Sequence, residues 1–297
     1  MGITDSIINY RRFLKRRNCS THSVKSYMNI LQQFVRWVDV PVEQTGRAKI
    51  TDYIESLLSK QLTAKTINCH LGCIRGFYDY LYQEEGIAIA NPVKKGYRLR
   101  VPRPLPRFLK DEEVLKLFSV IKTFRDRAMF MLMLRCGLRV EEVAHLTVTA
   151  IDLKRKRIMV EHGKGSKDRV VYISRDAHDA LMAYLRVRPA TGARRVFLVG
   201  KGKDTGTPIS VRGIQKRIEY YAQRAGMKVS CHQLRHTMAT QLLNADTELA
   251  TIQDLLGHRW ITTTQRYCKI CNLKVQRDYY KAMETVMLRT TPPGTLT

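Results

Sequence analysis

Residues 136–146 read CGLRVEEVAHL, and this stretch places a glycine between two helical patterns. Apolar residues recur at helical spacing over residues 125–135, and Gly137 is suited to end that helix because glycine adopts left-handed backbone angles without steric cost. A short helix is then expected over residues 139–146, with Arg139 in its first turn beside backbone N–H groups that have no partner within the helix. An arginine placed there can bind phosphate oxygens, although a capping role at the surface is the favoured interpretation for this segment taken alone.

The segments around this stretch predict a helical domain that contains a small sheet, over residues 108–297. Two β-branched runs lie within residues 148–173 and are joined by the Gly-rich sequence HGKGSKD, which is typical of an antiparallel hairpin. The last residues, TTPPGTLT, have no apolar face and are expected to be disordered. The helical patterns of this domain cover residues 111–121, 125–135, 139–146, 211–225, 231–244, 248–256 and 273–287.

Upstream, residues 1–93 carry four helical patterns and predict a separate helical domain. Ser20 is a plausible N-cap for an apolar face that begins at Val24, and a second long face follows Thr63 and stops near Gly86. Residues 94–107, KKGYRLRVPRPLPR, join the two domains. Their prolines disfavour helix and central strand alike, so this stretch is expected to be a stiff, basic linker. An ordinary surface loop is the simpler interpretation.

The charge of the chain indicates a polyanionic partner. The 52 Lys and Arg residues exceed the 26 Asp and Glu residues, which leaves a formal charge of +26. The basic residues are interleaved with apolar ones along amphipathic segments, so nucleic acid is the favoured partner. No stretch reaches the roughly 20 apolar residues of a membrane span, and the first residues lack the order of a signal peptide. We therefore expect a cytoplasmic protein, associated with the bacterial nucleoid.

The seven cysteines are scattered along the chain and are expected to be free thiols. Cys268 and Cys271 form a C-x-x-C pair, a spacing that zinc sites and redox sites share. Because the sequence has no second such pair, we predict neither a metal site nor a cofactor.

Two further motifs of the second domain carry cations that can meet a phosphate. In GKGSKDR, Lys164 lies between two glycines on a turn that can approach a phosphate closely, although a solvated hairpin tip has the same composition. In HQLRH, His232 and Arg235 are three residues apart and share one helix face, so both can contact one oxyanion. His236 is expected to point elsewhere.

A histidine and a tyrosine complete the set. The sequence LLGH ends at His258, and Tyr267 follows nine residues later in RWITTTQRY. Taken alone, such a histidine is more often structural than catalytic, and Tyr279 or Tyr280 could be proposed in place of Tyr267. The spacing from His258 favours Tyr267.

In order and spacing these motifs resemble the signature of the tyrosine recombinase or phage integrase family, and most of all its Xer-type members. The resemblance runs from residue 108 to about residue 285, whereas the first domain is similar to the family's core-binding domain in size, helicity and position. It implies a mainly α fold with a small antiparallel sheet, arranged as a C-shaped clamp of two domains. It also implies the site residues: Arg139, Lys164, His232, Arg235 and His258 as catalytic groups, Glu142 as a supporting acid, and Tyr267 as the nucleophile.

The resemblance further implies a site-specific recombinase that forms a covalent 3′-phosphotyrosine and needs neither metal nor ATP. Its partners would be double-stranded DNA with inverted repeats and three more copies of itself, assembled on two DNA sites through the helix at residues 273–287. A type IB topoisomerase and a non-catalytic DNA-binding regulator on the same fold are the alternatives. A metal-dependent transposase is disfavoured because the sequence shows no set of carboxylates at metal-ligand spacing.

Overall fold

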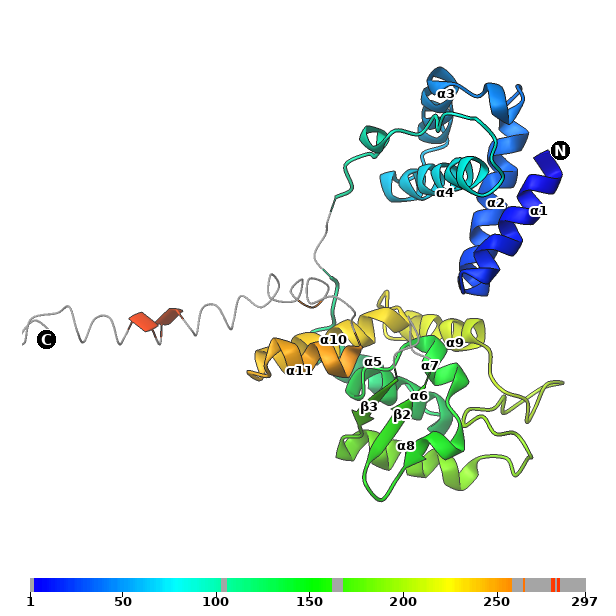
Figure 1. Ribbon diagram of the computed structural model, residues 1–297. Coiled ribbons are helices and arrows are strands. Elements are labelled where there is room, and N and C mark those ends of the chain that lie inside the picture. The colour runs from blue at the N-terminus through cyan, green and yellow to red at the C-terminus, as the bar shows by residue number, and fades with distance from the viewer. Residues whose placement is uncertain are drawn as a thin grey trace, which may run out of the picture. The chain divides into compact units, whose positions relative to one another are not determined.

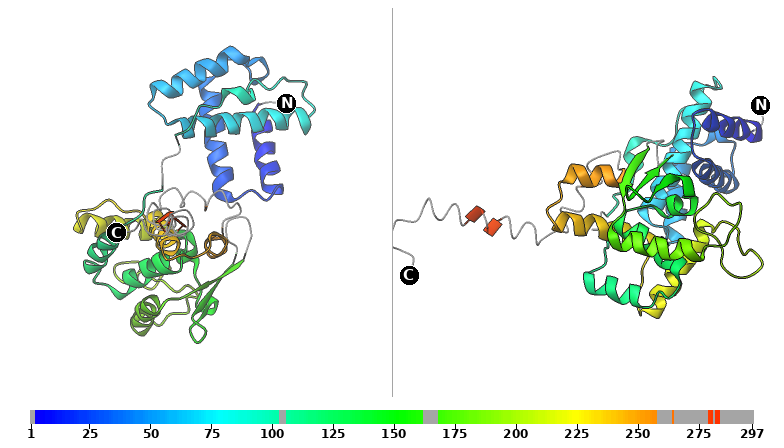
Figure 2. Two further views of the ribbon diagram at one scale, coloured as in Figure 1. Left: turned by 90° about the vertical axis from the view of Figure 1, so that its left-hand side faces the viewer. Right: turned by 90° about the horizontal axis from the view of Figure 1, so that it is seen from below.

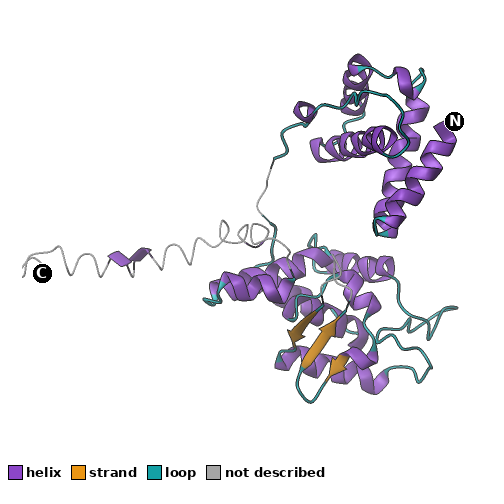
Figure 3. Ribbon diagram, in the orientation of Figure 1, coloured by secondary structure: helices purple, strands orange, loops and turns teal. Residues whose placement is uncertain are grey.

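The computed structural model describes residues 3–102, 106–161 and 168–257, together with residues 264, 279, 280, 282 and 283. Its contacts divide the chain into two compact units, Met1–Arg103 and Pro104–Thr297. The first unit is helical, and the second combines helices with one small sheet (Figures 1 and 3). The predicted mainly α fold with a small antiparallel sheet is confirmed. Over the described ranges, none of the helices combines the length and apolar character of a membrane span.

Side-chain caps fix where two helices of the first unit begin. Ser20 accepts a hydrogen bond from the backbone N–H of Ser23, as its predicted N-cap role requires, and Thr63 accepts one from Thr66. The elements of this unit are α1 (Ile3–Arg16), α2 (Thr21–Trp37), η1 (Val42–Gln44), α3 (Arg47–Ser59), α4 (Ala64–Gln83) and η2 (Lys95–Tyr97).

Helix α4 contacts each of the other three α-helices of the first unit. The left view of Figure 2 shows it crossing the neighbouring helices α1 and α2. Its predicted apolar face is buried in these contacts, and the Tyr53 hydroxyl pairs with Nδ1 of His70 at 2.9 Å inside the same core. This helix is therefore the scaffold of the first unit.

The chain that leaves α4 remains fastened to it. The side chain of Asn68 donates to the carbonyl of Leu99 and accepts from its backbone N–H, both at 2.8 Å. Asn91 bonds to the carbonyl of Arg75 at 3.0 Å and to the carboxylate of Asp79 at 2.6 Å. The first part of the stretch predicted as a linker, residues 94–107, is thus anchored on the first unit.

The second unit contains seven described α-helices and three strands. Helix α6 lies at its core, because most of its side chains are buried and it contacts α7, α8 and α10. The elements are α5 (Asp111–Ser119), α6 (Phe124–Arg135), α7 (Val140–His145), η3 (Val148–Ala150), β1 (Ile151–Asp152), β2 (Arg157–Val160), β3 (Arg169–Tyr172), α8 (Arg175–Val187), α9 (Val211–Arg224), α10 (Cys231–Asn244) and α11 (Leu249–Leu256).

The strands form one antiparallel sheet in the order β1, β2, β3. Ile158 pairs with Val171, and both are fully buried, so this face of the sheet packs on the core. Val160 pairs with Arg169 on the same face, because side chains alternate between the two faces of a strand. The sheet therefore directs one arginine inward.

A buried carboxylate joins α6 to α9 in this unit. Asp126 is fully buried, and its two oxygens accept bonds from Arg125 at 2.9 Å, from Arg217 at 2.7 Å and from the Tyr221 hydroxyl at 3.0 Å. A buried charge is tolerated only when it is paired and hydrogen-bonded in this way. The network fixes α9, the helix that precedes α10 and its HQLRH motif.

Candidate active site

Gly137 turns the chain between α6 and α7. Its φ of +64° lies in the left-handed region, and a Cβ atom at this position would lie 2.5 Å from Sδ of Met238. Both facts require glycine. The turn brings Arg139 to the N-cap of α7, one residue before the helix in which it was expected.

Arg139 and Arg235 donate hydrogen bonds to the same carbonyl oxygen. Arg235 comes from α10, is 2% exposed, and donates to the carbonyls of Gly137 and Leu256. Nη2 of Arg139 donates to the carbonyls of Leu256 and Gly257, at 3.3 Å each. Two guanidinium groups far apart in the sequence therefore meet at the C-terminal end of α11.

Glu142 holds the guanidinium of Arg139 in place. Its Oε1 accepts from Nη1 of Arg139 and its Oε2 accepts from the Arg139 backbone N–H, both at 2.7 Å. Burial alone would raise the pKa of Glu142, but the hydrogen bonds and charge of Arg169, followed by the N–H and charge of Arg139, lower it to about 2. Glu142 is thus ionised near neutral pH, and it acts as an acceptor that orients the arginines.

Arg169 of β3 is a site residue that the sequence reasoning missed. Its Nη1 and Nη2 each donate to one oxygen of Glu142 at 2.8 Å, and its Nε donates to the carbonyl of Leu255 at 3.0 Å. Its side chain is only 8% exposed. The alternation in RVVYI could have identified it, because Arg169 shares a strand face with the apolar Val171 and Ile173.

The last turn of α11 is the point where three arginines converge. The carbonyl of Leu255 accepts from Arg169, that of Leu256 accepts from both Arg139 and Arg235, and that of Gly257 accepts from Arg139. Carbonyls at the C-terminal end of a helix carry partial negative charge, which makes them suitable acceptors for cations. Among the residues that the structure describes, the ion pairs of this cluster involve the carboxylate of Glu142 with two of its three guanidinium groups, an arrangement that suits an anionic ligand.

His232 is exposed on α10, one turn before the buried Arg235. Its ring lies against that of His236, with 4.2 Å between the ring centroids. The expectation that His236 points elsewhere is wrong, because residues four apart are neighbours on a helix surface. Any imidazole chemistry at His232 therefore involves a second imidazole beside it.

The other predicted site residues lie outside the described residues. They are Lys164, His258 and Tyr267, together with Cys268 and Cys271 of the C-x-x-C pair and most of the helix expected over residues 273–287. The structure therefore brings together Arg139, Glu142 and Arg235 from the predicted set.

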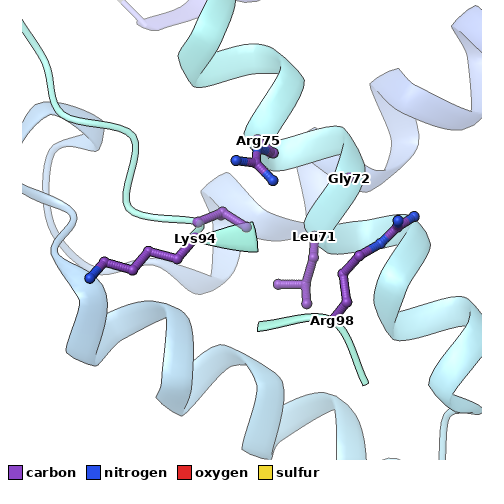
Figure 4. Close-up of a pocket in the computed structure, with 6 residues that line it drawn as sticks. Leu71, Gly72, Arg75, Lys94 and Arg98 are labelled. Atoms are coloured by element: carbon purple, nitrogen blue, oxygen red, sulfur yellow. The ribbon is translucent and has the colours of Figure 1, made fainter. Parts of the chain in front are cut away.

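The first unit carries a second basic feature, a hollow of about 500 Å³ beside α4. Figure 4 shows Arg75 of α4 beside this hollow, together with Lys94 and Arg98 from the segment that follows. None of the ion pairs found among the described residues involves these three side chains. Their charges remain available to an external anion.

Comparisons with known proteins extend over both units. Residues 107–272 match the phage integrase family, and residues 7–87 match the N-terminal SAM-like domain of phage integrases. The chain is 35% identical over 269 residues to the tyrosine recombinase XerD of Pseudomonas aeruginosa, covering 85% of this chain and 88% of that protein. It is 32% identical over 276 residues to the tyrosine recombinase XerC of Thermodesulfovibrio yellowstonii, covering 89% and 91%.

The fold is also found in solved structures. A lambda integrase dimer bound to a core site is similar with a TM-score of 0.74 and 16% identity, over 90% of this chain and 95% of that chain. At such low identity the likeness concerns the fold alone. The matched families and the relatives, taken with the arginine cluster, place the chain in the phage integrase family, the tyrosine recombinases that break and rejoin DNA.

Proposed function

We propose that this chain is a site-specific DNA recombinase, in which Tyr267 attacks a DNA phosphate and forms a covalent 3′-phosphotyrosine. The observation that carries the proposal is the meeting of Arg139 and Arg235 at the carbonyl of Leu256. Two planar cations that share one acceptor are spaced to share one phosphate group.

The arginines supply what attack on a phosphodiester requires. A phenol has a pKa of about 10, and the transition state places extra negative charge on the non-bridging oxygens. A phosphate that replaces the Leu256 carbonyl receives hydrogen bonds from both Arg139 and Arg235, and Glu142 keeps the first of them oriented. The positive charge is held by the fold before DNA binds, so little reorganisation is needed during the reaction.

The remaining roles follow from the family resemblance. Tyr267 forms a bond to phosphorus as the bond to the 5′ oxygen breaks, and that oxygen takes a proton from Lys164. His232 assists removal of the phenolic proton, and His258 donates to a non-bridging oxygen. A 5′ hydroxyl from a partner strand can reverse the attack, so cleavage and rejoining consume no ATP and no metal ion.

The basic hollow of the first unit supports a role in holding DNA. Arg75, Lys94 and Arg98 can neutralise backbone phosphates, which carry no sequence information but fix the position of a protein on a duplex. The charge of +26 supports the same role, and we propose that the protein acts in the cytoplasm on the nucleoid.

We propose further that recombination involves a tetramer on two DNA sites, joined through residues 273–287. A chain that ends at Asn272 should then bind a single DNA site normally and fail to form the four-subunit complex. Analytical ultracentrifugation with site-containing DNA measures this assembly. If the truncated chain still forms the tetramer, residues 273–287 do not mediate its assembly.

A nicked suicide substrate, from which the cleaved 5′ fragment diffuses away, tests the central proposal by trapping protein on DNA. The unchanged protein should form an adduct that survives denaturing electrophoresis, and Tyr267→Phe should bind DNA and trap none. Tyr279→Phe is the matched control and should trap normally, since Tyr279 is an exposed tyrosine near the C-terminus. EDTA should leave trapping intact. Adduct formation by Tyr267→Phe, or a requirement for magnesium, would contradict the mechanism.

Trapping, together with assays of supercoil relaxation and strand exchange, separates the alternatives. A type IB topoisomerase would relax supercoiled DNA without exchanging strands between two sites, and a regulator would bind DNA and trap nothing. Strand exchange between two labelled sites is expected of a recombinase alone.

A further inference from the structure

We infer that Arg169 is a positioning residue for DNA cleavage, which fixes the last turn of α11 and the carboxylate of Glu142 against each other. The inference rests on the proposed function. The family resemblance does not assign a catalytic role to Arg169. Its side chain is almost fully buried, and it binds Glu142 and the carbonyl of Leu255.

The hydrogen-bonding capacity of the Arg169 guanidinium is directed at two parts of the site at once. Its two terminal nitrogens bind the two oxygens of Glu142 at 2.8 Å, in the planar two-point geometry that arginine provides and lysine does not. Its Nε binds the carbonyl of Leu255 at 3.0 Å. Arg169 therefore connects the carboxylate that orients Arg139 with the helix end that Arg139 and Arg235 contact.

Gly257 shows how closely the Arg169 side chain packs against the end of α11. Its φ of +57° lies in the left-handed region at the C-cap of α11, and a Cβ atom there would lie 2.9 Å from Cδ of Arg169. The aliphatic part of the Arg169 side chain thus packs against the backbone of Gly257, while its Nε binds the carbonyl of Leu255. The chain continues from Gly257 directly into His258, so Arg169 fixes the point from which that residue starts.

Loss of Arg169 should consequently slow cleavage far more than it weakens DNA binding. A displacement of about 1 Å at a reacting group can cost on the order of 100-fold in rate. For Arg169→Gln we expect the rate of covalent trapping at saturating suicide substrate to fall by about 10- to 100-fold, with DNA affinity within about threefold of the unchanged protein. Arg157→Gln is the matched control, because Arg157 pairs with Asp152 on the solvent side of the same sheet and should change trapping by less than about twofold.

The Arg169→Lys variant separates the effect of the positive charge from that of the fixed hydrogen-bond donors of the guanidinium group. Lysine keeps the positive charge and can reach Glu142, but it cannot also donate to Leu255 from a second fixed nitrogen. We expect Arg169→Lys to recover the melting temperature and to remain at least about tenfold slow in trapping. Trapping at the unchanged rate would show that charge alone suffices and would overturn the inference.

A double-mutant cycle with His258→Gln decides whether Arg169 acts through the end of α11. If it does, the double variant should trap within about threefold of the slower single variant, because the second change removes nothing further. If the losses in trapping rate of the two single variants multiply in the double variant, the inference is overturned while the recombinase proposal stays intact. The absence of any adduct from the unchanged protein would overturn both. Should Arg169→Gln fail to fold, as a melting curve would reveal, the cycle is run with Arg169→Lys.

Discussion

Replacing Glu142 with glutamine removes the negative charge that pairs with two of the three arginines of the site, Arg139 and Arg169. The carboxylate accepts four hydrogen bonds, two from Arg139 and two from Arg169. A glutamine amide has one oxygen and one NH₂ group, so the two donors that faced the lost oxygen would now face another donor. We expect Glu142→Gln to lower the free energy of unfolding of the second unit.

The pKa of Glu142 gives the size of this effect. The arginines lower that pKa from 4.5 to about 2 in spite of burial. At about 1.4 kcal/mol for each tenfold change in acidity, the difference corresponds to about 3 kcal/mol. Because the folded-state pKa is the lower one, this stabilisation is complete above pH 4.5 and is lost as the pH falls toward 2.

Amide hydrogen exchange of β3 and α7 peptides in the full-length protein measures the opening free energy of this unit. At neutral pH, Glu142→Gln should lose about 3 kcal/mol, and at about pH 3 more than half of the difference between the two proteins should have disappeared. Asp152→Asn is the control, because Asp152 also pairs with two arginines but is accessible to solvent, and its effect should be much smaller. A difference for Glu142→Gln that is below about 1 kcal/mol at neutral pH, or that does not change with pH, would refute the reasoning.

Three further outcomes follow from the contacts. Gly257→Ala should cost about 1–2 kcal/mol in thermal unfolding, because alanine is strained at a φ of +57° and its Cβ would collide with Arg169; an unchanged melting temperature would contradict this. Asp126→Asn should cost about 3 kcal/mol in urea unfolding, since it removes the buried charge that pairs with the partly buried Arg125 and Arg217. Arg75→Gln and Arg98→Gln should each reduce the slope of log affinity for DNA against log salt by about 1, measured by fluorescence anisotropy, whereas unchanged slopes would exclude phosphate contacts in the basic hollow.

Much of the fold could be predicted because local chemistry and tertiary packing agree. Ser20 caps the helix that its hydroxyl indicates, and the α4 face predicted from apolar spacing is buried. Strand β1 was missed because two residues are too few to show alternation. Helix α3 begins at Arg47, before the apolar pattern starts at Ile50, since polar residues in a first turn carry no periodic signal.

The site was predictable where side chains sit on helices with a recognisable motif. Arg139, Glu142 and Arg235 are brought together, whereas the assigned roles of Lys164, His258 and Tyr267 remain predictions. Arg169 escaped because an arginine after a Gly-rich turn suggests a solvated strand end, although it alternates with the apolar Val171 and Ile173 on one strand face. Its partners, Glu142 and the carbonyl of Leu255, come from other elements, and strand alternation does not identify them.

The carbonyl of Leu256 has a consequence for ligand selection. In the protein alone, the guanidinium groups of Arg139 and Arg235 already donate to main-chain oxygens, and Arg235 is almost closed to solvent. A small free anion such as sulfate or inorganic phosphate must displace these acceptors with its own binding energy. A DNA phosphate is delivered at high effective concentration, because contacts elsewhere along the duplex have already paid the entropic cost of association. We therefore expect the site to exclude soluble phosphates and nucleotides and to admit a phosphate that belongs to a bound duplex.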